Sequence, residues 1–159
     1  KPLSVSSNRG VNGIDGLIAT SLGEARTHAK PTVVLSGDLS FLHDIGSLAT
    51  VPRPDTSVVF IIVDNGGGGI FGFLPMSAHP SGFEPWFVTP HNQNIPQICR
   101  GFGLEVDDVT HLEELKATLT TRTRQSGLHV IHIPIDRVAS TEQHIKSFRE
   151  IVNLIEEGL

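Results

Sequence analysis

The sequence predicts an α/β fold, a three-layer sandwich in which a mostly parallel sheet carries helices on both faces. Two apolar, β-branched runs, Thr32–Leu35 and Val58–Val63, have the composition of strands buried on both faces of such a sheet. Each run ends in a polar cluster, Ser36-Gly37-Asp38 after the first and Asp64-Asn65 with four glycines after the second. Segments of helical periodicity alternate with the strands, which is typical of parallel connections.

Periodicity and chain-breaking residues predict the other elements. Ile14, Leu17, Ile18 and Leu22 recur at helical spacing, and Lys30-Pro31 ends that helix. In order, we expect a strand at Leu3–Ser6, a loop at Ser7–Gly13, a helix at Ile14–His28, the strand Thr32–Leu35, a helix at Phe41–Val51, the strand Ser57–Val63, helices at Ile95–Phe102 and His111–Gln125, a strand at Leu128–Pro134 and a helix at Ser140–Glu157.

The segment from Asn65 to Asn94 shows little regular periodicity. Prolines recur through it, and Phe83, Trp86 and Phe87 supply aromatic side chains. We therefore expect a long ordered loop, and a loop of this length in a compact domain is usually functional.

Length and composition narrow the function classes. A chain of 159 residues fits one domain, and its net charge of −5 without a basic block favours neither nucleic acid nor an anionic membrane. No apolar run is long enough for a membrane span, and the single cysteine, Cys99, fits a reducing, cytoplasmic compartment. The chain starts at Lys1-Pro2 without Met, so we expect a piece of a longer polypeptide.

The polar clusters predict a magnesium-diphosphate site. The carboxyl ends of neighbouring parallel strands are where open sheets bind ligands, and Asp38 and Asn65 both follow such ends. Carboxylate and amide oxygens are hard ligands that suit Mg²⁺. The glycines after Asn65 let the backbone approach a phosphate closely.

A dinucleotide-binding fingerprint competes with this interpretation. Gly67, Gly69 and Gly72 match its spacing and follow a strand. That fingerprint requires a helix to open at the glycines, and Pro75 comes too early for one to run. No Gly-Lys-Ser/Thr sequence is present, so a P-loop is excluded.

Taken singly, the same residues have structural explanations. Asp38 could cap a helix, Arg9 could be an ordinary loop residue, Ile14 a core residue, and the four glycines a mobile linker. His129 and His132 lie three apart on a strand and face opposite sides, so we expect no zinc site there. We expect Cys99 to pack as a small hydrophobic residue.

Several motifs together resemble one family. Gly37-Asp38 is followed 27 positions later by Asn65, the spacing of the thiamin diphosphate fingerprint, although Leu39 replaces its usual glycine. The specific motifs are Asn8-Arg9-Gly10, Gly13-Ile14-Asp15-Gly16, Gly37-Asp38-Leu39-Ser40, Asn65-Gly66-Gly67, Ile70-Phe71 and Leu74-Pro75. With them the whole chain resembles the C-terminal, diphosphate-binding domain of the 2-succinyl-5-enolpyruvyl-6-hydroxy-3-cyclohexene-1-carboxylate synthases, the MenD family. Asp64 stands where that family more commonly has Asn.

The resemblance implies roles for individual residues. Asp38, Asn65 and the main-chain carbonyl of Gly67 would bind Mg²⁺ or Mn²⁺, and Ile14 would wedge thiamin diphosphate into its bent form. Arg9 would meet a substrate carboxylate, and Phe71 with Leu74 would line an apolar wall of the substrate pocket. The residues implied in holding the cofactor are Ile14, Gly37, Asp38, Leu39, Ser40, Asn65, Gly67, Gly69, Ile70 and Phe71.

The resemblance also implies a reaction and partners. The family decarboxylates 2-oxoglutarate and adds the succinyl carbanion to isochorismate in menaquinone biosynthesis, as a homodimer or homotetramer. Its catalytic Glu belongs to a pyrimidine-binding domain, usually of a neighbouring subunit, so we expect none in this chain and no activity from the chain alone. Two alternatives stay open: another thiamin diphosphate enzyme, of the acetohydroxyacid synthase or 2-oxoacid decarboxylase type, and a degenerate, non-catalytic domain.

Overall fold

The computed structural model describes residues 3–8 and 13–158. The chain divides into two compact units, each of which is described by itself. Unit 1 comprises Lys1–Val63 and Asn94–Ile133, and unit 2 comprises Asp64–Gln93 and Pro134–Leu159. Among the described residues, no helix is both long enough and apolar enough to cross a membrane.

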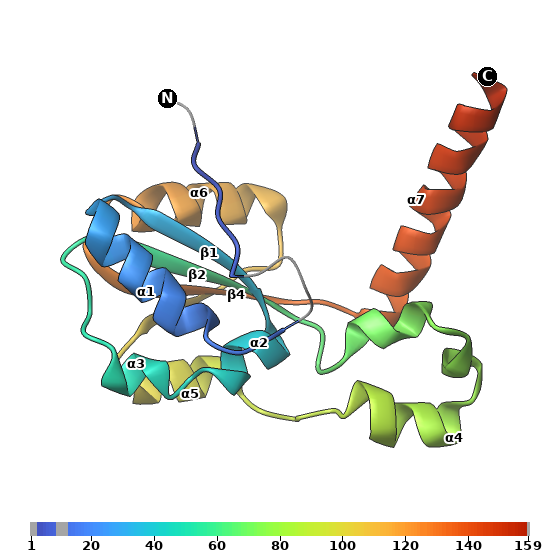
Figure 1. Ribbon diagram of the computed structural model, residues 1–159, viewed down its shortest axis with the longest axis horizontal. Helices are drawn as coiled ribbons and strands as arrows, with labels where there is room; N and C mark the ends of the chain where they lie inside the picture. The colour runs from blue at the N-terminus through green and yellow to red at the C-terminus, as the bar shows by residue number, and fades with distance from the viewer. Residues whose placement is uncertain (1–2, 9–12, 159) are drawn as a thin grey trace. The chain divides into compact units, whose positions relative to one another are not determined.

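Unit 1 is built on a four-stranded sheet (Figure 1). Its strands are β1 (Thr32–Gly37), β2 (Ser57–Asp64), β3 (Glu105–Asp108) and β4 (Gly127–Pro134), in the order β1-β2-β4-β3. β1 pairs with β2 in parallel, with Gly37 opposite Val63, and β3 pairs with β4 in parallel. The predicted parallel sheet is therefore confirmed.

Helices cover both faces of this sheet, which confirms the three-layer prediction. One face packs against α1 (Leu17–His28), α2 (Asp38–His43), α3 (Ser47–Thr50) and α5 (Ile95–Gly101). Their side chains form one core cluster with β-strand residues such as Phe60 and Ile62, which are fully buried. The other face packs Val59 and Ile61 against Leu115 and Leu119 of α6 (Leu112–Arg122).

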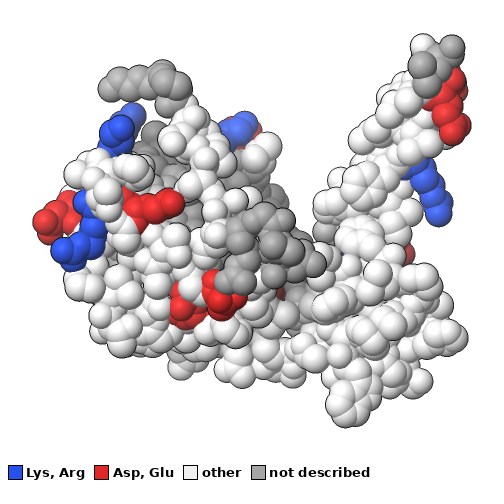
Figure 2. All heavy atoms as spheres, viewed as in Figure 1, with Lys and Arg blue, Asp and Glu red and all other residues white. Residues whose placement is uncertain are grey.

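Unit 2 consists of short helical segments and one long helix. The segments are η1 (Gly69–Phe73), η2 (Pro75–Ala78), α4 (Pro80–Phe83) and the π-helical η3 (Glu84–Val88), and the long helix is α7 (Arg137–Glu157). Arg137 donates to both carboxylate oxygens of Glu84 at 3.0 Å, which ties η3 to the start of α7. The residues from 65 to 93 include one Asp, Glu, Lys or Arg, namely Glu84, and Figure 2 shows this part of the visible surface almost free of charged side chains.

Three predicted elements need correction in unit 1. Leu3–Ser6 is not a strand: Leu3 and Val5 are exposed, and a strand needs a hydrogen-bonded neighbour to form. The first helix begins at Leu17 rather than Ile14, because Gly16 precedes it in a left-handed conformation with φ of 71°. The predicted helix Phe41–Val51 is two helices, α2 and α3.

Further corrections concern the sheet and the segment after β2. β3 was not expected, since three of its four residues are acidic. β1 is not buried on both faces: it lies at the sheet edge, and Val33 and Leu35 are exposed because α6 packs over β2 instead. The segment predicted as a loop contains η1, η2, α4 and η3, but none of these is the long helix that a dinucleotide fingerprint requires.

Candidate functional site

The end of β1 leads directly into a buried carboxylate. Asp38 is 2% exposed and is the first residue of α2, with Gly37 in the cap position before it. Its Oδ1 accepts a hydrogen bond from the Leu39 N–H at 2.7 Å. Asp38 therefore does not cap the helix as its N-cap residue, the alternative that cap preference suggested; it lies one position inside the first turn, beside Leu39 and Ser40.

The turn before α1 carries Ile14, which is 44% exposed. Gly16, the N-cap residue of α1, has no side chain that could accept a hydrogen bond from the first-turn N–H groups. An acceptor for one of these groups therefore comes from elsewhere in the chain. Asp44 provides it: Oδ2 accepts from the Ala19 N–H at 3.0 Å, while Oδ1 accepts from the Ser47 hydroxyl at 2.7 Å. Sequence reasoning missed Asp44, since nothing local indicates a cap supplied from 25 positions away.

The end of β2 leads into a tight loop in unit 2. The Oδ1 of Asp64 accepts from the Gly66 N–H at 3.0 Å, and its main-chain carbonyl accepts from the Ile135 N–H at 2.8 Å. The Oδ1 of Asn65 accepts from the Gly67 N–H at 3.2 Å. The loop thus folds back on its two polar side chains, and both predicted ligand residues, Asn65 and Gly67, lie in it.

Glycine is required inside this loop because other backbone lies against it. A Cβ on Gly67 would collide with the carbonyl oxygen of Val88, and one on Gly68 would lie 2.5 Å from the carbonyl oxygen of Phe87. The Gly68 N–H donates to the Val88 carbonyl at 2.7 Å, and the Gly67 carbonyl accepts from the Gly69 N–H at 2.9 Å.

The residues predicted for the apolar wall follow in η1. Phe71 is 38% exposed and contacts Phe87 edge to face with ring centroids 6.0 Å apart. The Leu74 N–H donates to the Phe71 carbonyl at 3.0 Å, which keeps the two residues in one turn. Leu74 and Ile70 are also exposed, so these side chains are accessible.

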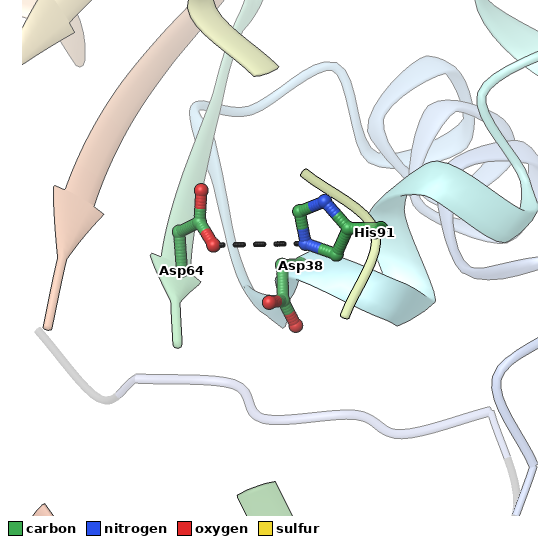
Figure 3. A group of neighbouring side chains, drawn as sticks. All are labelled: Asp38, Asp64 and His91. Atoms are coloured by element: carbon green, nitrogen blue, oxygen red, sulfur yellow. Dashed lines mark ion pairs between the residues drawn. The ribbon is translucent and has the colours of Figure 1, made fainter. Parts of the chain in front are cut away.

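A histidine that sequence reasoning did not select faces the same loop. Nε2 of His91 lies 3.8 Å from Oδ1 of Asp64, and Figure 3 marks this contact with a dashed line. The two side chains are only 11% and 15% exposed. Asp64 in place of the family's commoner Asn was the one signal in the sequence, and nothing near His91 indicated its partner.

The predicted site residues fall into two groups, one in each unit. In unit 1, Gly37, Asp38, Leu39 and Ser40 are contiguous, with Ile14 before α1. In unit 2, Asn65, Gly67, Gly69, Ile70, Phe71 and Leu74 follow one another and are joined by the hydrogen bonds above. Gly37 pairs with Val63 in the sheet, so the segments leaving β1 and β2 start from adjacent positions. Arg9 lies outside the described residues.

Each group by itself offers donors of the kind that suits a hard divalent cation. A buried carboxylate, a side-chain amide and a main-chain carbonyl are all oxygen donors, the set that Mg²⁺ prefers. The backbone of Gly67 and Gly68 is packed so closely that side chains are excluded, and their N–H groups donate within the unit, to Oδ1 of Asn65 and to the Val88 carbonyl. In donor chemistry, the residues of each group therefore fit a Mg²⁺ ion.

Three titratable side chains elsewhere in unit 1, those of Cys99, Arg122 and His132, take part in packing or in contacts within the sheet and its helices. Cys99 is fully buried in the core cluster, which confirms that it packs as a hydrophobic residue, and this burial raises the pKa of its thiol to about 11. Hydrogen bonding to Asp107 raises the pKa of Arg122 above its usual value. Nδ1 of His132 lies 2.8 Å from Oδ1 of Asp108, so this pair joins β4 to β3.

Comparison with protein families gives one match that spans most of the chain. The family described as "Thiamine pyrophosphate enzyme, C-terminal TPP binding domain" matches residues 9–133. This span includes every residue predicted to bind metal, cofactor or substrate.

Curated relatives point to one enzyme. The 2-succinyl-5-enolpyruvyl-6-hydroxy-3-cyclohexene-1-carboxylate synthase of Myxococcus xanthus is 35% identical over 99% of this chain and 27% of its own length. The synthase of Bacillus cytotoxicus is 36% identical over 100% of this chain and 27% of its own length. The chain therefore spans about a quarter of the length of the relatives it matches.

Solved structures agree on the fold. The benzoylformate decarboxylase of Polynucleobacter necessarius superposes with a TM-score of 0.62 at 25% identity, over 78% of this chain and 23% of that one. A thiamine diphosphate-dependent 4-hydroxybenzoylformate decarboxylase from Rhodococcus jostii has the same TM-score, 0.62, at 20% identity, over 76% of this chain and 23% of that one.

Proposed function

The chain belongs to the family of C-terminal TPP-binding domains of thiamine pyrophosphate enzymes, and we propose that it serves as this domain in a 2-succinyl-5-enolpyruvyl-6-hydroxy-3-cyclohexene-1-carboxylate synthase. The relatives that match nearly the whole chain carry that name, and each is almost four times as long. In this proposal the remaining length of the enzyme supplies a pyrimidine-binding domain with the catalytic Glu, in a homodimer or homotetramer of the cytoplasm.

The proposed reaction decarboxylates 2-oxoglutarate and adds its succinyl remainder to isochorismate. Thiamin diphosphate, when bound, supplies the electron sink for this chemistry, and the protein binds and orients the reactants. The residues of this chain are proposed to hold the diphosphate end of the cofactor and part of the substrate. The chain alone is expected to be inactive, because the acid that activates the cofactor lies in another domain.

The metal site is proposed to use Asp38, Asn65 and the Gly67 carbonyl. The observation that carries this proposal is the pairing of Gly37 with Val63, since it starts the two ligand-bearing segments at adjacent positions of the sheet. Mg²⁺ takes near-octahedral oxygen coordination and keeps several positions for phosphate and water, so three protein oxygens are a suitable set. Mn²⁺ would be accepted by the same oxygen donors.

The diphosphate is proposed to lie against main-chain N–H groups and one hydroxyl. These belong to Leu39, Ser40, Gly69, Ile70 and Phe71, and the hydroxyl is that of Ser40. The N–H groups of Leu39, Gly69 and Phe71 also donate within the chain, so each would share its hydrogen with a phosphate oxygen. Ile14 is proposed to support the bent cofactor, which suits its exposure before α1. The exposed side chains of Phe71 and Leu74 are proposed to form an apolar wall of the substrate pocket.

Arg9 is proposed to bind a substrate carboxylate, because a guanidinium can do so with two parallel hydrogen bonds. In the full-length enzyme, Arg9→Ala should lower turnover at least about tenfold, since losing one partner of a buried charge pair costs about 2–5 kcal/mol. Arg9→Lys should rescue only in part. Collapse of cofactor binding with unchanged substrate saturation would move Arg9 from the substrate to the cofactor.

The decisive experiment is cofactor titration by calorimetry, with and without Mg²⁺, on the full-length protein. Asp38→Ala and Asn65→Ala should each abolish Mg²⁺-dependent binding of thiamin diphosphate, because few protein ligands hold the ion. Asp55→Ala is the matched control, since Asp55 is exposed and lies before β2. Unchanged affinity in both ligand variants would overturn the metal assignment.

A different thiamin diphosphate enzyme remains the second candidate, favoured by the structural likeness to benzoylformate decarboxylase. Turnover of the full-length protein with 2-oxoglutarate and isochorismate, compared with pyruvate alone, separates the two. A degenerate domain would instead show no Mg²⁺-dependent cofactor binding at all.

A further inference from the structure

Asp64 is the residue on which the glycine loop of unit 2 depends most. Its carboxylate accepts a hydrogen bond from the Gly66 N–H, and its main-chain carbonyl accepts one from the Ile135 N–H. The side chain and the main chain of Asp64 therefore both bind backbone N–H groups. Asn65 and Gly67 follow within three positions, and the Asn65 side chain accepts from the Gly67 N–H. Any rotation of the Asp64 side chain would therefore disturb the loop that bears two of the proposed ligands.

Hydrogen bonds to Gln93 orient His91 so that its Nε2 faces the Asp64 carboxylate. Its Nδ1 accepts a hydrogen bond from the Gln93 N–H at 3.0 Å, and its main-chain carbonyl accepts from the Gln93 side-chain amide at 2.9 Å. A ring nitrogen that accepts carries no proton, so neutral His91 has its N–H on Nε2. Nε2 faces Oδ1 of Asp64 at 3.8 Å, which is an electrostatic contact rather than a direct hydrogen bond (Figure 3).

The backbone just before His91 also lies against the loop. The Val88 carbonyl accepts from the Gly68 N–H at 2.7 Å and fills the space that a Cβ on Gly67 would need. The segment from Val88 to His91 thus contacts the loop twice, once through backbone and once through the imidazole. Low exposure of Asp64 and His91 strengthens the second contact, because little water screens it.

We propose that His91 is a positioning residue: through Asp64 it holds the Asp64–Gly67 loop in the geometry in which Asn65 and Gly67 offer their oxygens to the metal. The inference rests on the proposed function and adds to it a residue outside the proposed ligand set of Asp38, Asn65 and the Gly67 carbonyl. An Asn at position 64 would lack the negative charge that attracts His91, so the Asp in this chain and its histidine work as a pair.

The test is a double-mutant cycle on Mg²⁺-dependent binding of thiamin diphosphate, measured by calorimetry on the full-length protein. His91→Ala and Asp64→Asn should each weaken binding about threefold to tenfold, in the range of coupling between contacting residues. The double variant should be no weaker than the weaker single variant, because both changes remove the same contact. His91→Gln keeps an N–H donor and should stay within about twofold of wild type.

Three controls separate positioning from a general loss of structure. His79→Ala changes an exposed histidine of the same unit and should leave affinity unchanged. Circular dichroism should match wild type in every variant, and thermal melting should show no more than a small local loss of stability. Raising the Mg²⁺ concentration should restore cofactor affinity in His91→Ala, because all the proposed ligands are still present and the loop is only less ordered before the ion binds. Asp38→Ala lacks a ligand, so its affinity should not recover.

The outcomes distinguish this inference from the proposed function. Wild-type protein without Mg²⁺-dependent binding overturns both. Wild-type binding together with unchanged affinity in His91→Ala, or with single effects that multiply in the double variant, overturns the positioning role alone. If His91→Gln weakened cofactor binding as much as His91→Ala, that result would also contradict the positioning role.

Discussion

The two compact units of this chain differ in what stabilises them. Unit 1 holds both hydrophobic clusters, and its sheet is covered by helices on either face. Among the described residues of unit 2, the buried hydrophobic ones are Phe83 and Val88, and no residue of α7 is buried. Unit 2 relies instead on aromatic contacts, on the Arg137–Glu84 pair and on hydrogen bonds around its glycine loop.

This difference shows how the proposed ligands are positioned by different forces. Asp38 directly follows a strand of the packed sheet, so the burial of apolar side chains around that sheet holds it in place. Asn65 and Gly67 lie in a loop whose geometry depends on individual polar contacts. Substitutions in the apolar core of unit 1 should therefore act mainly on stability, and those in the loop should act on both local stability and metal binding.

The largest expected effect is in the core of unit 1. Phe60 is fully buried and contacts Phe41 edge to face, with centroids 5.7 Å apart. Phe60→Ala should lower the free energy of unfolding by about 3–5 kcal/mol, through lost burial and the cavity left behind. Urea denaturation measures it. Trp86→Ala in unit 2 is the control, because Trp86 is 79% exposed and its loss should cost less than about 0.5 kcal/mol. Equal effects would contradict the contrast between the units.

The next effect uses the same substitution in both units. Gly67 has φ of 146° and its missing side chain leaves room for the Val88 carbonyl, so Gly67→Ala should destabilise by about 1–3 kcal/mol. Gly23 lies in the middle of α1 with open space around it, so Gly23→Ala should stabilise by about 0.5–1 kcal/mol. Thermal melting compares the two variants, and shifts of the same sign would refute the argument from backbone conformation.

The smallest expected effect sharpens the comparison within unit 1. Asp44→Ala removes the acceptor for the Ala19 N–H and for the Ser47 hydroxyl, and loss of such a cap costs about 0.5–2 kcal/mol. Asp44→Asn keeps an acceptor oxygen and should recover most of this stability. Urea denaturation tests both, with the exposed Asp55→Ala as reference. If Asp44→Ala matches that reference, the cap contributes nothing.

The elements predicted well from sequence are those whose pattern is local. Ile18, Ser21, Leu22 and Ala25 recur at helical spacing, and all four are buried in α1. Six consecutive residues of β2, from 57 to 62, are buried, and five of them are apolar. The roles of Asp38, Asn65 and the glycines stay predictions: they rest on residue type and spacing, and the family match covers these positions.

The elements missed are those that exist only through a distant partner. β3 has one apolar residue among three acids, and it forms because it pairs with β4, where Asp108 meets His132. Leu3–Ser6 has a strand-like composition, but no strand forms there, because composition alone supplies no hydrogen-bonded neighbour.

The sequence by itself determined the fold class, the family and the residue types of the proposed cofactor site. Local periodicity and short motifs contain that information, since each depends on a few neighbouring residues. Only the tertiary structure decided that Asp44 caps α1 and that His91 faces Asp64. Such contacts join residues far apart in the chain, and their geometry is decided by packing that no local pattern records.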